Sequence, residues 1–403
     1  MQIAIQIVGY ILIAGLLALS GCHPALKKQA RSPAEALTRI RYFYPAFCDD
    51  LDRHSLVSAI NKNMAYLKRL PPETSFHYGP DIFTRDQVLE SQKAFRQLIE
   101  NTSDISDINR IIKEDYLVYR ATGRAGNSTV LFTGYFEPIY EARLTPDHKW
   151  RYPIYRKPED LTSIDLSLFN VKCTGRRLMA RIEGQTVLPY YTRYQIDEER
   201  VLDGRHLELA WLKDPVDVAF LQIQGSGQLK LPNGEILSVG YAASNGHPYR
   251  SIGGYMIREG LLSRKEMSMQ AIRHYLSQHP MQRSEILNIN PSYVFFRILE
   301  NGPLGNISVP LTPGRSIALD SELFPKGALA FISCVKPVCN GDGEIGEIIR
   351  WQPFSRYVLN QDTGGAIKGA GRADIFWGNG PYAEMAAGHL KHEGKLFILI
   401  KRP

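Results

Sequence analysis

Residues 360–380 read NQDTGGAIKGAGRADIFWGNG, and this stretch holds the densest polar signal of the chain. Four glycines separate Asp362 from Asp374, and Gly378 follows shortly after. Glycine permits tight turns and a close approach of two backbones, so the stretch predicts closely packed turns around two carboxylates. These two carboxylates make it the candidate site of the chain.

Asp374 is the stronger candidate because Ile375, Phe376 and Trp377 follow it directly. Large apolar neighbours desolvate a carboxylate and raise its pKa, and a general acid near neutral pH needs such a raised pKa. The alternative is that both aspartates only cap turns, which is a common role of aspartate. On spacing alone, the turn-capping interpretation is the stronger one.

The pattern of the whole chain predicts a mainly β protein with helical decoration (α+β). Apolar residues recur at helical spacing within residues 34–100, where Pro71-Pro72 end one predicted helix and Thr84 begins the next, and again within 254–287. Short strands are predicted at 130–136, 218–224, 229–231, 294–298, 316–319, 329–334, 356–359 and 396–400.

The composition is that of a folded globular chain, with 403 residues of which 44% are hydrophobic and 22% charged. The formal net charge of +7 suits an anionic partner such as a membrane surface, a nucleic acid or an acidic wall polymer. Outside Lys27, Lys28 and Arg31 no basic run occurs, so no nucleic-acid partner is expected.

The N-terminus predicts an exported protein attached to a membrane. Residues 1–21 carry no charged side chain, and Leu19-Ser-Gly-Cys22 resembles the lipobox of bacterial lipoproteins, whose cysteine is acylated after cleavage. His23, in place of an aspartate, implies sorting to the outer membrane, on its periplasmic face. The sequence departs from the usual signal in having no Lys or Arg before the apolar run.

The alternative to a lipid anchor is a plain transmembrane segment, since about 20 apolar residues can span a bilayer. The position of Cys22 at the expected cleavage point favours the lipoprotein. Residues 1–22 are therefore expected to be the signal and 23–33 a tether. Under either interpretation, residues 23–403 lie outside the cytoplasm.

Four further cysteines are present: Cys48, Cys173, Cys334 and Cys339. An exported protein can form disulfides, and Cys334 and Cys339 flank a loop-like stretch, so they either bridge a hairpin or stay free thiols. No Cys/His pattern has the spacing of a zinc site, so no metal is expected.

The tail segment is similar to a known domain. Asp320 lies in SIALDSELFPKG at 316–327, and this segment together with 362–369 and 372–378 resembles the 3D domain, named for three aspartates. Further segments resemble, in order, the membrane-bound lytic transglycosylase A family: TGYFEP at 133–138, YPIY at 152–155, LPYYTR at 188–193, IQGSG at 223–227, GY at 240–241, NGHPY at 245–249 and NPSYVFF at 290–296. Each motif is short, but their joint order is highly specific.

This resemblance implies the architecture of the chain. It implies a double-psi β-barrel domain that holds the 3D motif, a second β domain inserted into it, and a groove between the two for a glycan strand. The expected division is a helical part at 34–135 that packs with the barrel, an inserted domain at 136–298 and the barrel domain at 299–403.

The resemblance also implies a reaction. The family cleaves the β-1,4 bond between N-acetylmuramic acid and N-acetylglucosamine in peptidoglycan and leaves a 1,6-anhydro sugar. Its catalytic aspartate falls on Asp374, with Asp362 and Asp320 as supporting aspartates. One carboxylate suffices where glycosidases need two, because the C6 hydroxyl of muramic acid is a tethered nucleophile. No metal or organic cofactor is needed.

Seven residues are candidates for binding the glycan through stacking or hydrogen bonds: Tyr135, Glu137, Gln224, Ser226, Asn245, Tyr249 and Lys368. For any single tyrosine, ordinary sheet packing is the stronger interpretation. The expected partners are peptidoglycan strands, the membrane and the wall-synthesis machinery. Two other functions stay open from sequence: a hydrolase on the same fold and a noncatalytic wall-binding lipoprotein.

Overall fold

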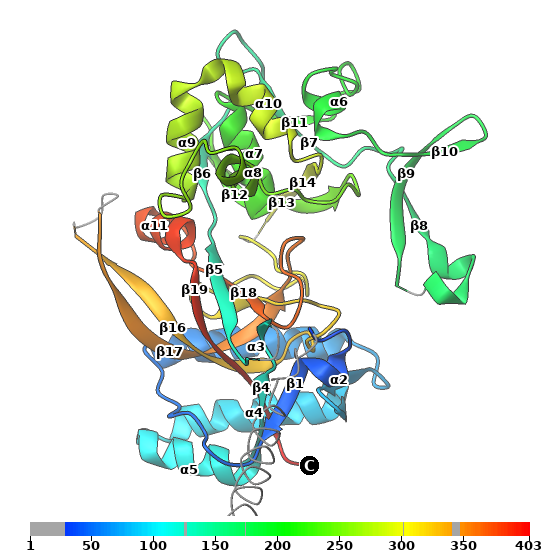
Figure 1. The fold of residues 1–403 in the computed structure, drawn as a ribbon. Coiled ribbons are helices and arrows are strands. Elements are labelled where there is room, and N and C mark those ends of the chain that lie inside the picture. The colour runs from blue at the N-terminus through cyan, green and yellow to red at the C-terminus, as the bar shows by residue number, and fades with distance from the viewer. Residues whose placement is uncertain (1–28, 125–126, 174, 301, 341–346) are drawn as a thin grey trace, which may run out of the picture.

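The computed structural model of the chain describes residues 29–124, 127–173, 175–300, 302–340 and 347–403. They form a lower part built around a barrel and an upper part made by residues 136–300 (Figure 1). The chain enters the upper part after β5 (Val130–Tyr135) and returns after β14 (Val294–Leu299). The expected domain boundaries themselves stay a prediction.

The lower part contains a closed six-stranded barrel extended by two more strands. Around the ring the order is β19-β16-β17-β15-β18-β5, and β5 pairs with β19 to close it. Strands β4 and β1 continue the sheet beyond β19. The bounds are β1 (Leu37–Ile40), β4 (Tyr116–Ala121), β15 (Ser316–Ala318), β16 (Leu329–Cys339), β17 (Ile348–Asp362), β18 (Arg372–Phe376) and β19 (His392–Lys401).

Helices cover the barrel, and local sequence sets where they begin. Asp52 accepts a hydrogen bond from the Ser55 backbone at the start of α3 (Arg53–Arg69), and Thr84 forms a capping box with Gln87 at the start of α4 (Arg85–Asn101). Helix α3 packs on β17 and α4 on β19, and α5 (Ile105–Asp115) packs on β4. Their apolar faces share one hydrophobic core with the barrel strands.

The upper part is a four-stranded sheet covered by helices, with a smaller sheet beside it. The sheet order is β14-β13-β12-β6, and β11 pairs with β7. The bounds are β6 (Ile139–Glu141), β7 (Tyr152–Tyr155), β11 (Glu208–Leu212), β12 (Ser226–Lys230), β13 (Ile236–Ser244), α6 (Arg193–Asp197), α7 (Pro215–Gln224), α8 (Ile252–Arg258), α9 (Met269–Gln278) and α10 (Arg283–Asn288). The predicted mainly β fold, with a barrel and a second β unit, is confirmed.

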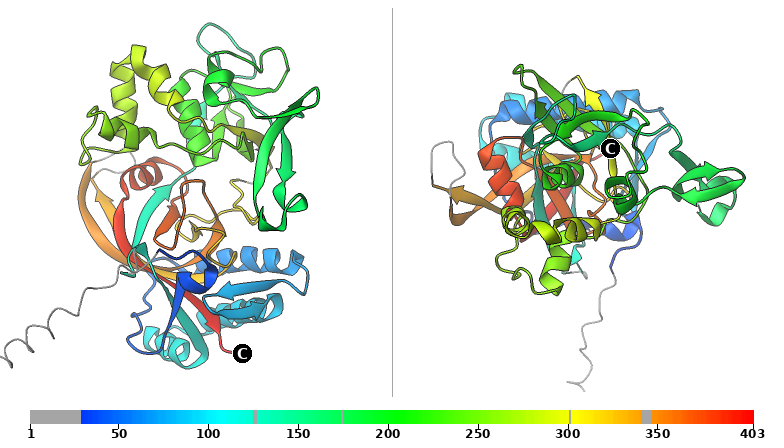
Figure 2. Two further views of the ribbon diagram at one scale, coloured as in Figure 1. Left: turned by 45° about the vertical axis from the view of Figure 1, so that its right-hand side comes forward. Right: turned by 90° about the horizontal axis from the view of Figure 1, so that it is seen from above.

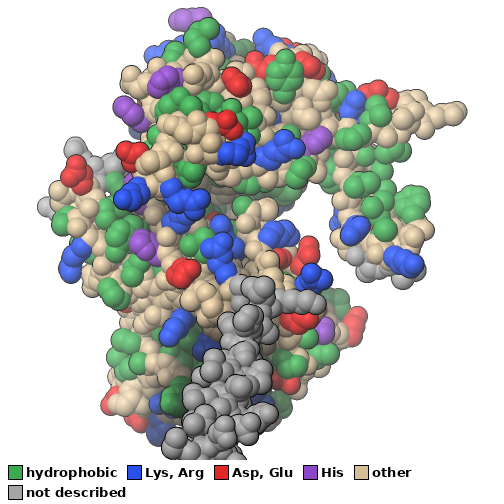
Figure 3. All heavy atoms as spheres, viewed as in Figure 1, with side chains coloured by type: hydrophobic (Ala, Val, Ile, Leu, Met, Phe, Trp, Pro, Cys, Tyr) green, Lys and Arg blue, Asp and Glu red, His purple; other side chains and the backbone are tan. Residues whose placement is uncertain are grey.

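A three-stranded arm projects from the upper part (Figures 1 and 2). It consists of β8 (Thr162–Asp165), β9 (Arg177–Glu183) and β10 (Thr186–Pro189), in the order β10-β9-β8. Figure 3 shows a deep notch between this arm and the body of the molecule.

Two predictions of secondary structure are wrong. Residues 218–224 form the end of helix α7 rather than a strand, because Asp214 caps the helix, Pro215 occupies its first turn and nearly all its faces are buried. Residues 34–100 are not wholly helical, since they include β1 and the hairpin of β2 (Ser75–Tyr78) and β3 (Asp81–Thr84). Gly79, with φ of +66°, makes the turn of that hairpin.

Two buried arginines fasten the N-terminal segment to the barrel. Arg315 is fully buried and donates to Asp49 Oδ2 at 2.6 Å and to three further oxygens. Arg356, 2% exposed, donates to both carboxylate oxygens of Asp50 at 2.8 and 2.9 Å. Lys336 adds a 2.7 Å ion pair to Asp50. Bidentate geometry of this kind makes strong, directional contacts.

The idea of a disulfide between Cys334 and Cys339 is wrong. Both lie in strand β16, five positions apart, which corresponds to roughly 16 Å along an extended chain and to opposite faces of the strand. A disulfide requires Cα atoms within about 7 Å of each other. Both thiols are free, as are those of Cys48 and Cys173.

The predicted lipidation site, Cys22, and the signal at 1–22 lie outside the described residues, as does most of the tether at 23–33. None of the helices in the described ranges combines the length and the apolar character needed to cross a bilayer.

The Asp50 carboxylate should matter more for stability than an exposed one. We expect Asp50→Ala to lower the free energy of unfolding by about 3 kcal/mol, because it leaves the buried Arg356 without its partner. Glu114→Ala removes a carboxylate from an exposed ion pair with Arg110 and should change the free energy of unfolding far less, because solvent screens that pair. Urea unfolding at pH 7 measures both, and equal losses would contradict the role of Asp50.

The effect of Asp50 should depend on pH. Burial opposes ionisation, but the hydrogen bonds and charges of Arg356 and Lys336 outweigh it and hold the pKa of Asp50 below its usual value of 3.8. Because the folded pKa is the lower one, this stabilisation is complete above pH 3.8 and is lost as pH falls through the folded pKa. The difference between wild type and Asp50→Ala should therefore shrink in urea titrations at increasingly acid pH.

Candidate active site

Strand register brings the two predicted carboxylates to the same face of the barrel. Ala318 of β15 is the register partner of Asp362 in β17 on one side and of Asp374 in β18 on the other. Opposed residues of neighbouring strands project to the same face, so both carboxylates flank the small Ala318 side chain. With about 4.8 Å between strands, the two aspartate Cα atoms lie roughly 10 Å apart.

Strand β5 supplies one hydroxyl donor to each carboxylate. Thr133 Oγ1 donates to Asp374 Oδ1 at 2.7 Å, and the hydroxyl of Tyr135 donates to Asp362 Oδ2 at 2.8 Å. Residues two apart in a strand project to the same face, which is why one strand reaches both aspartates. The parallel pairing of β5 with β18 sets Thr133 directly opposite Asp374.

Gly134, between these two donors, faces the other way and lets β5 lie close to Trp377. A Cβ atom at Gly134 would lie 2.6 Å from Trp377 Nε1, which leaves no room for any other residue without rearrangement. Trp377 is 8% exposed and packs edge-on against Phe354. The glycine thus fixes the distance between β5 and the end of β18.

The surroundings of Asp374 favour a proton carrier. The side chain is partly accessible to solvent but surrounded by protein, and burial raises its pKa to about 6. The hydrogen bond from Thr133 and the charge of Arg372 oppose this shift, whereas the charge of Asp362 adds to it. Arg372 also donates to Thr133 Oγ1 at 3.4 Å.

Asp362 has a similar pKa for a different balance of reasons. Burial raises its pKa to about 6, against the hydrogen bonds from Tyr135 and from two backbone N–H groups. These are the N–H of Asn306 at 3.0 Å and that of Thr363 at 2.9 Å, both to Oδ1. Asp362 therefore sits in a nearly complete set of donors, which fixes its orientation.

The third aspartate, Asp320, lies apart from this pair. It is 4% exposed and accepts from the Gly369 backbone at 2.7 Å and from the Glu322 backbone at 3.1 Å. These contacts hold the glycine-rich loop between β17 and β18. Lys368 is exposed on the outside of this loop and lies 3.8 Å from Asp320 and 3.5 Å from Glu322.

Three predicted binding residues lie where the chain crosses into the upper part. Glu137 is 3% exposed, accepts from Gln228 Nε2 at 3.0 Å, and has a pKa raised by burial. Gln224 accepts from the Phe136 backbone at 3.0 Å, and Ser226 is buried at the start of β12. These contacts hold residues 136–137, which directly follow β5, against α7 and β12. The role of the three residues in binding the glycan stays a prediction.

Asn245 is enclosed in the upper part, and its role in binding the glycan stays a prediction. Asn245 is 1% exposed, and its amide donates to the carbonyls of Tyr191 and Pro291 at 2.8 and 2.9 Å. Its oxygen accepts from the backbone of Tyr293 at 2.9 Å. Its hydrogen-bonding groups are used within the fold, so none is left to meet a ligand.

Tyr249 is the most exposed of the predicted binding residues in the upper part, with 38% of its surface accessible. Burial raises the pKa of its hydroxyl, and the positive charges of Arg193 and Arg372 oppose this shift. Its role in binding the glycan stays a prediction.

Three site residues are absent from the sequence-based prediction: Thr133, Arg372 and Asn306. The first two lie within motifs that carried the family resemblance, and alternation along a strand would have placed each on the face of its neighbouring site residue. Asn306 contributes only a backbone N–H, for which a sequence carries no signal.

The arrangement is suited to acid–base chemistry. Two carboxylates with pKa values near 6 lie on one face of the barrel sheet, so near pH 6 one of them can carry a proton while the other stays charged. One has a single hydroxyl donor, and the other is held by several donors. A group that moves a proton needs the freer environment, which is that of Asp374.

Comparison with known proteins agrees with this geometry. Residues 131–297 match the family described as MltA specific insert domain, and residues 315–400 match the 3D domain. The chain is 34% identical over 275 residues to the membrane-bound lytic murein transglycosylase A of Vibrio cholerae, which is 67% of this chain and 65% of that protein. It is 32% identical to the Escherichia coli K12 protein of the same name, over 71% of this chain and 69% of that one.

Solved structures are similar over most of the chain. A membrane-bound lytic murein transglycosylase from Agrobacterium tumefaciens has 31% identity and a TM-score of 0.71, over 87% of this chain and 93% of that one. Escherichia coli MltA with bound chitohexaose has 26% identity and a TM-score of 0.69, over 94% and 97%. By these matches, the chain belongs to the membrane-bound lytic murein transglycosylase A family.

Proposed function

We propose that the protein is a lytic transglycosylase that cleaves the β-1,4 bond between N-acetylmuramic acid and N-acetylglucosamine in peptidoglycan. The observation that carries the proposal is the Thr133–Asp374 pair: a carboxyl with a pKa near 6, oriented by one hydroxyl and open to solvent. The names of the relatives, murein transglycosylases, supply the substrate.

In this proposal Asp374 acts twice. As the acid, it gives its proton to the glycosidic oxygen while the bond from that oxygen to C1 breaks and an oxocarbenium-like centre forms. The C6 hydroxyl of the same muramic acid then attacks C1, and its proton returns to Asp374. The product is a 1,6-anhydro sugar, no water is consumed, and the carboxyl is ready for another turn.

Asp362 supports this chemistry without transferring a proton. Its negative charge faces the place where positive charge develops at C1, and fixed charges of this kind stabilise a transition state. Burial, with the charge of Asp362 adding to it, raises the pKa of Asp374 to about 6, so the protonated acid is available at mildly acid pH. Tyr135 holds Asp362 in this orientation. Asp320 acts at a distance, by holding the loop that joins the two strands.

We further propose that the protein works attached to a membrane, because its relatives are named membrane-bound transglycosylases. The finer form of this proposal is acylation at Cys22 and residence on the periplasmic face of the outer membrane. The wall-synthesis machinery is a proposed partner. The lipobox-like residues 19–22 and the net charge of +7 support this placement.

Replacing Asp374 tests the central claim. We expect Asp374→Asn to lower the rate of peptidoglycan release by about a thousandfold, the usual scale for loss of an acid–base group, while binding to insoluble peptidoglycan stays as in wild type. Mass spectrometry of wild-type products should show anhydro sugars, lighter by one water than hydrolysis products. Asp107→Asn, at an exposed site on α5, is the matched control and should keep full activity.

Two outcomes would favour other functions. Products with an ordinary reducing end would identify a hydrolase. If wild type and Asp374→Asn both bind peptidoglycan and neither releases sugars, the protein is a binding module.

The rate should also depend on pH through Asp374. The acid form is the one that starts the reaction, so turnover should fall as pH rises through about 6. Thr133→Val removes a hydrogen bond that favours the charged form, so the falling limb should move up by roughly one pH unit while the maximal rate drops. Thr186→Val, on the arm, should change neither. A Thr133→Val profile that moves down in pH would contradict this role.

A further inference from the structure

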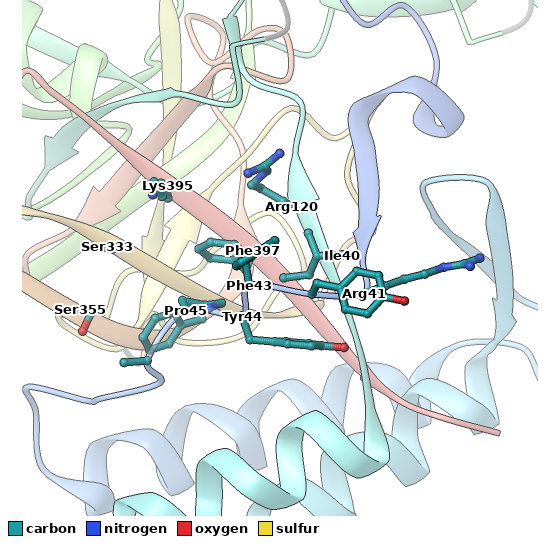
Figure 4. Close-up of a pocket in the computed structure, with 13 residues that line it drawn as sticks. Ile40, Arg41, Phe43, Tyr44, Pro45, Arg120, Ser333, Ser355, Lys395 and Phe397 are labelled. Atoms are coloured by element: carbon teal, nitrogen blue, oxygen red, sulfur yellow. The ribbon is translucent and has the colours of Figure 1, made fainter.

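A cavity lies on the outside of the barrel, and neither Asp362 nor Asp374 lines it. Its volume is about 610 Å³, within the usual size of ligand pockets. Its floor is the outer face of β4, β19 and β16, and its rim is the segment 40–46, which crosses that face (Figure 4). Strand β17 leads from Ser355 in this cavity to Asp362, so the two sites are roughly 23 Å apart.

The charge of this cavity favours an anion. Its lining includes Arg41, Arg120 and Lys395, and none of its thirteen lining residues is acidic. Within the described part of the chain, none of these three cations forms an ion pair, and Arg120 Nε is buried without a hydrogen-bond partner. A buried donor left unpaired costs free energy, so an anion that accepts from Arg120 would be stabilised there.

Figure 4 shows how these side chains are arranged. Arg120 and Lys395 lie on one side of the cavity, Tyr44 and Pro45 lie on the other, and the Arg41 side chain extends away from it. Arg120 and Lys395 are therefore the two cations that an anion inside the cavity would contact. The aromatic ring of Phe397 forms part of the floor between them.

The rim carries two aromatic side chains that the fold does not use. Tyr42 is 77% exposed and Phe43 is 101% exposed, so neither contributes to the core. Phe43 also has φ of +56°, a conformation uncommon for residues other than glycine, and strain of this kind concentrates at functional sites. Exposed aromatics beside basic residues are typical of surfaces that enter the interface of a bilayer.

The proposed membrane attachment brings this surface within reach of lipid. Eleven residues lead from Cys22 to Pro33, which begins the first described helix, and they span at most about 40 Å when extended. Seven residues further on, Ile40 begins the rim of the cavity. A soluble anionic ligand would use the cavity but would give Tyr42 and Phe43 no role, which favours a lipid.

We propose that this cavity binds the phosphate of an anionic phospholipid headgroup, with Tyr42 and Phe43 placed in the bilayer interface. The proposal rests on the proposed membrane attachment and is independent of the cleavage reaction. It would hold the barrel in one orientation on the membrane, where a tether alone would leave it free to turn.

Tryptophan quenching in vesicles tests this directly. The full chain carrying Phe43→Trp is reconstituted into phosphatidylcholine vesicles with or without phosphatidylglycerol, both with brominated acyl chains, and the emission of the four native tryptophans is subtracted. We expect strong quenching only with phosphatidylglycerol. The control is Met281→Trp, since Met281 is 93% exposed on the upper part, and it should not be quenched.

Removing the cations should reverse the effect. In the Phe43→Trp background, Arg120→Gln and Lys395→Gln should each raise the phosphatidylglycerol content needed for half-maximal quenching by about fivefold. Equal quenching of Phe43→Trp in both vesicle types, or none in either, would overturn the proposal. The proposal would also be overturned if peptidoglycan stem peptides abolished the quenching. It would be overturned as well if inorganic phosphate bound at Arg120 while the Phe43→Trp emission did not respond to lipid.

Peptidoglycan release by the same variants separates this proposal from the proposed function. Neither Arg120 nor Lys395 touches the candidate active site, so the detergent-solubilised variants should release sugars at the wild-type rate. If the Arg120 and Lys395 variants lose quenching but release sugars at the wild-type rate, the change affects the lipid site alone. If the wild-type protein releases no sugars, the proposed cleavage reaction fails and the lipid site is unaffected.

Discussion

The register of three short strands is the constraint on which the candidate site depends. Asp362 and Asp374 come from neighbouring segments of sequence, but the strand that contains Ala318 lies between them in the barrel. A larger side chain than alanine at that position would fill the space into which both carboxylates project. Strand β5 then adds Thr133 and Tyr135, one for each aspartate, because alternate residues face the same way. Backbone pairing therefore sets the positions of the two carboxylates, and with them the burial that raises both pKa values.

The buried arginines protect this register. Arg315 immediately precedes β15, and its guanidinium is bound to Asp49 and to the start of helix α3. Arg356 lies in β17 and is bound to Asp50. Two consecutive aspartates thus fasten two neighbouring barrel strands to one N-terminal segment. Burying these charges carries a desolvation cost, which the complete set of partners offsets.

The sequence allowed much of the barrel to be predicted, because strands such as β16 and β19 contain short apolar runs, LAFI at 329–332 and LFILI at 396–400. Interpreting an apolar run as a strand failed for α7. Its apolar residues surround the helix, so the sequence shows no apolar stripe at helical spacing. Asp374 could be singled out from its apolar neighbours and its motif. Its contact with Thr133 could not, because 241 residues separate the two and only the closed barrel joins them.

Predictions for binding residues were weaker for a related reason. Asn245 has the chemistry of a ligand-binding residue, but turns and buried loops use the same chemistry to satisfy their own backbone. Composition cannot tell an amide that faces a ligand from one that faces a carbonyl. Tyr249 and Asn245 lie four residues apart in one motif, yet the first is exposed and the second is enclosed.

The barrel is assembled from both ends of the chain, and this sets the order in which the protein can mature. Strands β4 and β5 are made early, but their partner β19 consists of residues 392–401, close to the C-terminus. The upper part, with hydrophobic clusters of its own, can form while they wait. Closing so long a loop is slow, so the ring of six strands is complete only after β19 has been made. Thr133 meets Asp374 through the pairing of β5 with β18, so a chain still in synthesis has no Thr133–Asp374 pair before residues 372–376 are made.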